Sequence, residues 1–131
     1  MQDVSTVLNA KAAISRHIQW KIALQLAITL QEPLTVEQIH QIWHARECAV
    51  GRWLDSPLTF GMRSSLQYSN LVRKHLEFHR EMGCIADLIV DGRFEDAARA
   101  ISPMSPFMQI SKALAHAIMA YDALTAIAVP V

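Results

Sequence analysis

A regular apolar stripe runs through residues 65–90, whose sequence is SLQYSNLVRKHLEFHREMGCIADLIV. Its members recur every three or four residues, which is the spacing of one face of an α-helix. They are Ser65, Tyr68, Val72, His75, His79, Met82, Ala86 and Ile89, widened by Leu71, Phe78 and Ile85. Such a broad apolar face suits the core of a helical bundle. The pattern predicts one helix that starts at Met62 or Ser64 and ends at about Val90, before the Asp-Gly pair at 91–92.

The rest of the chain predicts further helices on both sides of this one. Residues 4–30 contain neither Gly nor Pro and repeat at helical spacing, so we expect a helix that ends before Pro33. Thr35 and Gln38 form a capping-box pattern that opens the next helix. The apolar face expected for that helix consists of Val36, Ile39, Ile42 and Trp43. A break at residues 102–106 separates a short helix at 94–101 from a last long helix at 107–128.

Length and composition narrow the class of protein. The 131 residues fit one domain, residues 1–131, and 52% of them are hydrophobic. We therefore expect an all-α, four-helix-bundle-like domain with long antiparallel helices and short connecting helices. Twelve basic and twelve acidic residues give zero net charge, which argues against a nucleic-acid binder. The sequence predicts no membrane insertion and no signal peptide, so the expected location is the cytoplasm.

Histidines lie within the apolar stripes, where a plain bundle does not need them. His75 and His79 are four residues apart, which places their Cβ atoms about 5–6 Å apart on one helical face. His17 falls within the stripe of the first helix. Buried imidazoles are costly unless their ring nitrogens are paired, and a divalent metal ion would satisfy all three. Three imidazoles and one thiolate would suit zinc, whereas a helical dimer with hydrogen-bonded core histidines is the alternative without a metal.

Three separated motifs together resemble those of a known family. They are His17-Ile18-Gln19-Trp20-Lys21, Cys48-Ala49-Val50-Gly51-Arg52-Trp53-Leu54 and His75-Leu76-Glu77-Phe78-His79. Their order and spacing are similar to those of the chemoreceptor zinc-binding (CZB) domains of bacteria, over nearly the whole chain. Val50 stands where that family usually has Leu, a conservative difference that does not concern the metal.

The resemblance implies one Zn²⁺ ion held by His17, Cys48, His75 and His79. Around these ligands it implies motif-packing or second-sphere residues, namely Trp20, Lys21, Gly51, Trp53 and Phe78. Family members occur in chemoreceptors and beside diguanylate cyclase domains, commonly in dimeric proteins, where zinc or oxidation of the Cys alters signalling. The implied protein is a free-standing bacterial member that acts as a homodimeric sensor with such a signalling partner.

Cys48 can face the core only if the helix before it ends early. If the helix that begins after Thr35 continued straight, Cys48 would lie nearly opposite its apolar face. We therefore expect the helix to break near residues 46–48, so that residues 48–54 form a short element of their own. Trp53 would then anchor this element in the core, and Gly51 would permit a close approach.

The other histidines and the second cysteine are not predicted to belong to the metal site. His40, His44 and Cys48 are spaced four residues apart and could form a second metal-binding stripe, but His40 and His44 lie well round from Ile39 and Trp43, so we expect them to face solvent. His116 is expected to lie on the surface, and Cys84 to be a small packed side chain. The sequence contains no nucleophile motif or phosphate loop, so we do not expect an enzyme. Two rival functions remain open: zinc as a purely structural staple of an interaction domain, and a zinc hydrolase, which would need an open metal position.

Overall fold

Helices account for nearly all the regular structure of this protein. The computed structural model describes residues 10–128, apart from the side chains of residue 58 and residues 126–128. Its elements are α1 (Ala10–Leu30), α2 (Val36–Trp43), η2 (Ala45–Glu47), α3 (Ala49–Leu54), η3 (Pro57–Met62), α4 (Leu66–Val90), α5 (Phe94–Ala100) and α6 (Pro106–Ala128). The all-α prediction is confirmed, since residues 10–128 contain no strand. The part of the first helix expected at residues 4–9 lies outside the described residues.

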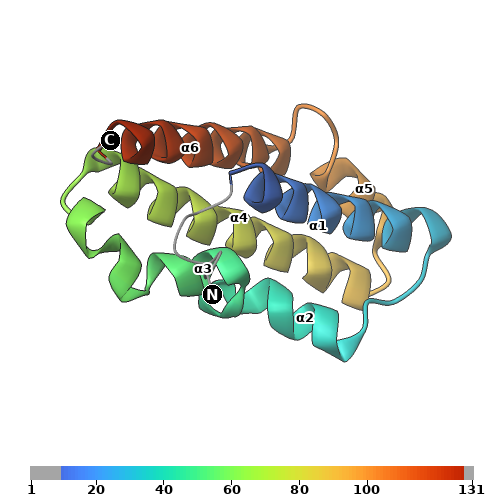
Figure 1. Cartoon of the computed structure of the whole chain (residues 1–131). Helices are drawn as coiled ribbons and strands as arrows, with labels where there is room; N and C mark the ends of the chain where they lie inside the picture. The colour runs from blue at the N-terminus through green and yellow to red at the C-terminus, as the bar shows by residue number, and fades with distance from the viewer. Residues whose placement is uncertain (1–9, 129–131) are drawn as a thin grey trace.

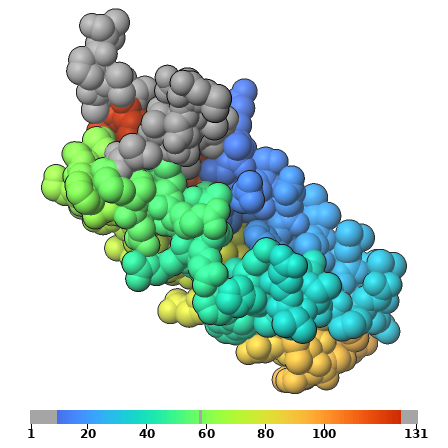
Figure 2. Space-filling view, turned by 60° about the horizontal axis from the view of Figure 1, so that its bottom comes forward, coloured from blue at the N-terminus to red at the C-terminus, as the bar shows by residue number. Residues whose placement is uncertain are grey.

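The long helices form a bundle around α4. Figure 1 shows that α1 and α4 run in one direction, whereas α2 and α6 run in the opposite direction. The segment α2–η2–α3 occupies the position that one continuous long helix would have in a four-helix bundle. It lies next to α1 on the face shown in Figure 2. Because α4 packs against α6, α2, α5, α3 and α1, a side chain on α4 can meet residues from most of the chain.

The core is mainly apolar, and the buried polar side chains of the described residues include the three histidines His17, His75 and His79 together with Thr59 and Ser105. The largest fully buried hydrophobic side chains are Tyr121, Phe78, Phe107, Leu24, Ile42, Leu71, Met82, Ile89, Leu114 and Ile118. They come from α1, α2, α4 and α6, as the stripes predict. Within the described residues, no helix combines the length and the apolar character needed to cross a membrane.

One helix boundary and one helix face differ from the sequence-based expectation. Helix α4 begins at Leu66, because residues 57–62 form the separate turn η3 and Ser65 caps α4. Val36 was expected on the apolar face of α2, but it is the first residue of that helix and is 85% exposed. Trp43 is partly exposed, yet its ring lies where a side chain on Gly83 of α4 would stand. The buried contact of α2 is therefore made mainly by Ile42.

The capping box of α2 is confirmed. The Thr35 hydroxyl accepts a hydrogen bond from the Gln38 amide at 3.0 Å, and the Gln38 side chain accepts one from the Thr35 amide at 2.9 Å. We expect Thr35→Ala to lower the free energy of unfolding by about 1 kcal/mol, because it leaves a backbone donor of the helix end without a partner. Urea denaturation measures the change. Thr35→Ser keeps the hydroxyl and should stay close to wild type; equal losses in both variants would contradict this role of the cap.

Candidate metal centre

Three helices bring four potential metal ligands to one buried point. His17 on α1, Cys48 just before α3, and His75 and His79 on α4 each offer a ligand atom, and these atoms all lie within 4.8 Å of one another. The three histidines are buried, with exposures of 5%, 2% and 3%, and Cys48 is half-buried. The structure thus brings together all four residues proposed as ligands, and they are positioned to bind a metal ion.

A break in the chain directs Cys48 inward, as the sequence analysis required. Helix α2 ends at Trp43, and the 3-10 turn η2 redirects the chain before α3 begins at Ala49. Cys48 is the N-cap of α3, with extended backbone angles and its Sγ accepting from the Gly51 amide at 3.5 Å. A Cβ atom on Gly51 would lie 2.1 Å from the carbonyl oxygen of Ala45, so this turn requires glycine. The predicted close approach at Gly51 is confirmed.

Backbone carbonyls orient two of the three imidazoles. Nδ1 of His17 lies 2.8 Å from the carbonyl oxygen of Ala13, and Nδ1 of His79 lies 2.9 Å from that of Ile42. A carbonyl oxygen only accepts, so each Nδ1 carries the proton and donates it, and each Nε2 keeps its lone pair. The Nε2 atom of His79 is buried without a hydrogen-bond partner. This is the tautomer and orientation that metal-binding histidines usually have.

His75 and Cys48 complete the set at close range. The Nε2 atom of His75 lies 3.1 Å from the Cys48 Sγ. The His75 ring centroid is 4.7 Å from that of His79 and 5.3 Å from that of His17, and both ring pairs are edge-on. Three nitrogens and one sulfur therefore face a common centre.

Burial keeps the three imidazoles neutral. It lowers the pKa of His17 to about 4, although the hydrogen bond to Ala13 acts in the opposite direction. Burial also lowers the pKa of His75 to about 3, and a positive charge on a protonated His79 or His17 would act in the same direction. The pKa of His79 is lowered for the same main reason. Neutral imidazole is the form that binds metal ions, so the site is ready for a cation at neutral pH.

The Cys48 thiol is subject to opposing influences. Burial raises its pKa, whereas the amides of Gly51 and Val50 and the charges of Arg16 and Arg52 lower it. The net direction is upward, so without a cation the thiol stays protonated at neutral pH. A metal ion held here would supply positive charge that favours the thiolate form of Cys48.

The lowered histidine pKa values predict acid instability of the metal-free protein. An unfolded histidine has a pKa of about 6.5, whereas His17 and His75 in the folded protein bind a proton only near pH 4 and pH 3. The unfolded state therefore binds more protons as the pH falls from about 6.5 towards 4, and the stability present above pH 6.5 is lost across that range. We expect a slope of about 1.4 kcal/mol per pH unit for each such histidine.

Urea denaturation at several pH values, with a chelator present, measures this slope. His75→Gln should reduce it, and His116→Gln, at an exposed site on α6, should leave it unchanged. Stability that is constant between pH 6.5 and pH 5 would contradict the prediction.

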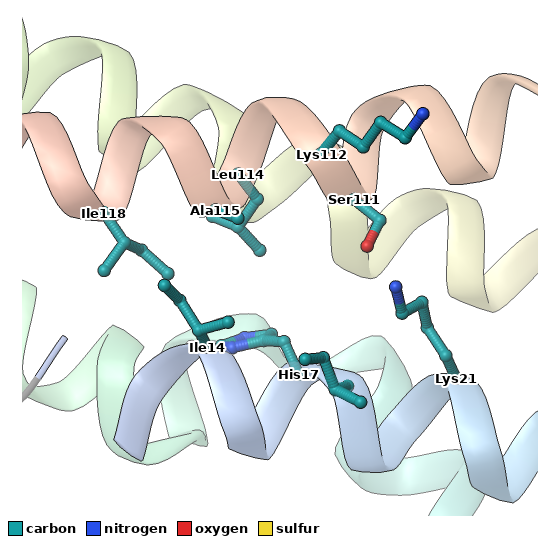
Figure 3. A pocket seen from close by; sticks show the side chains of 9 residues that line it. Ile14, His17, Lys21, Ser111, Lys112, Leu114, Ala115 and Ile118 are labelled. Atoms are coloured by element: carbon teal, nitrogen blue, oxygen red, sulfur yellow. The ribbon is translucent and has the colours of Figure 1, made fainter. Parts of the chain in front are cut away.

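The other motif residues surround the ligands. Phe78 is fully buried, and its ring centroid lies 5.2 Å from that of His17. Trp53 is half-buried and meets Tyr121 of α6 edge-on at 5.4 Å, so it anchors α3 against the bundle as expected. Lys21 and His17 line a cavity of about 120 Å³ between α1 and α6, and Figure 3 shows the Lys21 side chain extending towards Ser111. Trp20 is half-buried against the core.

The remaining histidines and cysteine lie elsewhere. His40, His44 and His116 are exposed, as predicted. The expectation for Cys84 was wrong: its side chain is exposed. The helical repeat explains this, because Cys84 lies on the outer face of α4 with Arg73, Arg80 and Asp87, opposite the His75 face.

Two features of the site could not be found from side-chain patterns. The carbonyl groups of Ala13 and Ile42 that orient the imidazoles belong to the backbone, so no residue type signals them. Glu47 lies beside His40 and His44 only because η2 turns the chain back towards α2.

Fold and site together define a helical bundle with a buried candidate metal centre of three histidines and one cysteine. Comparison with known proteins found no matching protein family, no matching curated protein and no matching solved structure.

Proposed function

We propose that this protein is a zinc-binding regulatory domain of the chemoreceptor zinc-binding (CZB) kind. The observation that carries the proposal is the convergence of His17, Cys48, His75 and His79 on one buried point. The three sequence motifs that contain these residues support it, since each motif supplies at least one ligand. In this proposal zinc occupancy, or oxidation of Cys48, changes how the domain contacts a signalling partner.

The ligand set favours zinc over other metals. Zinc in proteins prefers tetrahedral sites of imidazole nitrogen and thiolate sulfur, which places ligand atoms about 3.3–3.6 Å apart. In this structure the Cys48 Sγ lies 3.1 Å from the His75 Nε2, and all four ligand atoms lie within 4.8 Å of one another. The ideal separation falls between these two distances. Small side-chain rotations would close the set around one ion. The unpartnered Nε2 of His79 gives a buried lone pair that only a cation or a donor would satisfy.

Four protein ligands argue for regulation or structure and against catalysis. A catalytic zinc usually keeps one position open for water, whereas three histidines and one thiolate fill a tetrahedron. We therefore propose that the protein is not an enzyme. A purely structural zinc is the runner-up, because it would use the same closed ligand set.

The proposed regulatory role of zinc is based on the separate segments of the chain that carry its ligands. Zinc would connect α1, the junction before α3, and α4, so loss of the ion would release the α2–α3 segment from the bundle. Cys48 also lines a cavity of about 320 Å³ together with Arg16 and Arg52. A small oxidant could reach the thiolate there, and conversion to sulfenic acid would weaken its bond to the metal.

A surface on α1 suits the proposed homodimer. Ile18, Ile22, Leu26 and Leu30 recur every four residues and are 43% to 57% exposed. An exposed apolar stripe of this kind is typical of a helix that packs against a second protein chain. We propose that a second copy or a signalling protein, such as a chemoreceptor or a diguanylate cyclase, covers it.

Metal analysis of purified protein tests the zinc site. The wild type should contain one zinc per chain, measured by plasma mass spectrometry, and both Cys48→Ala and His75→Ala should lose it. Cys84→Ala and His116→Ala are matched controls at exposed positions and should keep it. Zinc retained in Cys48→Ala would refute the ligand assignment. A wild type without zinc after purification in zinc-containing buffer would refute the function.

A further inference from the structure

A second group of potential ligands lies outside the buried centre. His40 on α2, His44 just after it, and Glu47 in η2 are all exposed, and their ligand atoms lie within 4.8 Å of one another. Nε2 of His40 is 3.0 Å from a carboxylate oxygen of Glu47. The two imidazole rings are stacked, with centroids 3.9 Å apart and planes 19° from parallel.

The hydrogen bonds of this group leave the lone pairs a metal needs. Nδ1 of His44 lies 2.6 Å from the carbonyl oxygen of His40, so it carries the proton and leaves Nε2 free to bind. The ring of His44 is therefore oriented by a backbone carbonyl, as are the rings of His17 and His79. Binding of a cation at Nε2 of His40 would replace the hydrogen bond to Glu47, with the one proton of the neutral ring moving to Nδ1, so that Nε2 and the Glu47 carboxylate would both be free to bind the ion.

The surroundings have room for an ion. A cavity of about 320 Å³ is lined by His40, His44, Glu47 and Cys48, and by Glu37 from the first turn of α2. Arg16 and Arg52 also line it and oppose a cation. The Arg52 guanidinium donates to the backbone carbonyl of Glu47 at 2.8 Å, which fixes it on the backbone side of that residue.

We propose that His40, His44 and Glu47 form a second metal site for a divalent transition-metal ion such as Zn²⁺, Ni²⁺ or Cu²⁺. Two imidazoles and one carboxylate suit these ions, and water would complete the coordination. The site is weaker than the buried one, because its side chains are exposed and must be ordered on binding. Since Cys48 lines the same cavity, the second site lies at the solvent side of the buried centre.

Calorimetric titration of Zn²⁺ into protein already loaded with one equivalent tests the second site. The wild type should show a further, weaker binding event. His44→Ala and Glu47→Gln should each weaken that event by at least about tenfold, since loss of even an outer partner of a metal ligand costs that much. His116→Ala removes a different exposed histidine and should leave it unchanged. Absence of the event in the wild type, or its persistence in both site variants, would overturn the proposal.

One more variant separates this proposal from the proposed function. Cys48→Ala should lose the tight event and keep the weak one. If the tight event survives in Cys48→Ala while His44→Ala removes the weak event, the assignment of the buried site fails and the second site stands. If Cys48→Ala removes both events, the second site is not independent and the proposal is wrong.

Discussion

Removal of the metal should lower the melting temperature of the protein by about 10–20 °C. A ligand present at a thousand times its Kd stabilises the folded state by about 4 kcal/mol, and for a domain of this size each kcal/mol corresponds to about 3–5 °C. The bundle should remain folded, because its core of α1, α4 and α6 side chains does not depend on the metal. Thermal melts followed by circular dichroism, with zinc and with a chelator, measure the shift.

The loss of stability should be local as well as global. The segment α2–η2–α3 reaches the site through Cys48 and through the Ile42 carbonyl that holds His79, so its amides should exchange with deuterium faster after chelation. The amides in the middle of α6 serve as the internal control and should change less. Cys48→Ser should melt at the same temperature with and without chelator. A wild type that is also insensitive to chelator would contradict the prediction.

Gly51→Ala should disrupt the site without touching a ligand. The new Cβ atom would lie 2.1 Å from the carbonyl oxygen of Ala45 and 2.8 Å from the Cα of Arg46, and both are backbone atoms that cannot rotate away. The turn must therefore open and carry Cys48 with it. The clash should cost about 1–3 kcal/mol in the free energy of unfolding against a gain of about 1 kcal/mol in helix propensity, so we expect a net loss of up to about 2 kcal/mol. Zinc affinity should fall by at least about tenfold.

Gly61→Ala is the matched control for this substitution. A Cβ atom on Gly61 would meet no heavy atom within 4 Å, so the same chemical change should leave stability and zinc affinity close to wild type. Competition with a chromophoric chelator measures the affinity, and urea denaturation measures the stability. If Gly51→Ala binds zinc as tightly as Gly61→Ala, the turn does not control the position of Cys48.

The helices and the ligand set could be predicted because they follow from local spacing. His75 and His79 share one face of α4 with Phe78 and Met82, so the same repeat that places the core also places the imidazoles. The break before Cys48 followed from a conflict: a straight helix would have directed the thiol away from the apolar face. The capping box at Thr35 depends on four consecutive residues and was likewise visible in the sequence.

What could not be predicted depends on contacts between distant segments. The ring of Trp43 occupies the space above Gly83, a meeting of α2 and α4 that neither helix signals alone. Glu47 joins His40 and His44 through the geometry of a three-residue turn. The prediction that Cys84 is packed was wrong because residue type alone does not show which face of α4 the residue lies on.

The carbonyl groups that orient His17 and His79 have a consequence for how this centre tolerates change. Every residue has a backbone carbonyl, so Ala13 and Ile42 can each be replaced by a residue of similar size that still supplies the same hydrogen-bond acceptor. The path of the main chain therefore sets the orientation of these two imidazole rings, and substitutions at positions 13 and 42 should not change it. It is sensitive to displacement: a slide of α2 along α4 by a fraction of a helical turn would remove the acceptor from His79 while every residue remained in place.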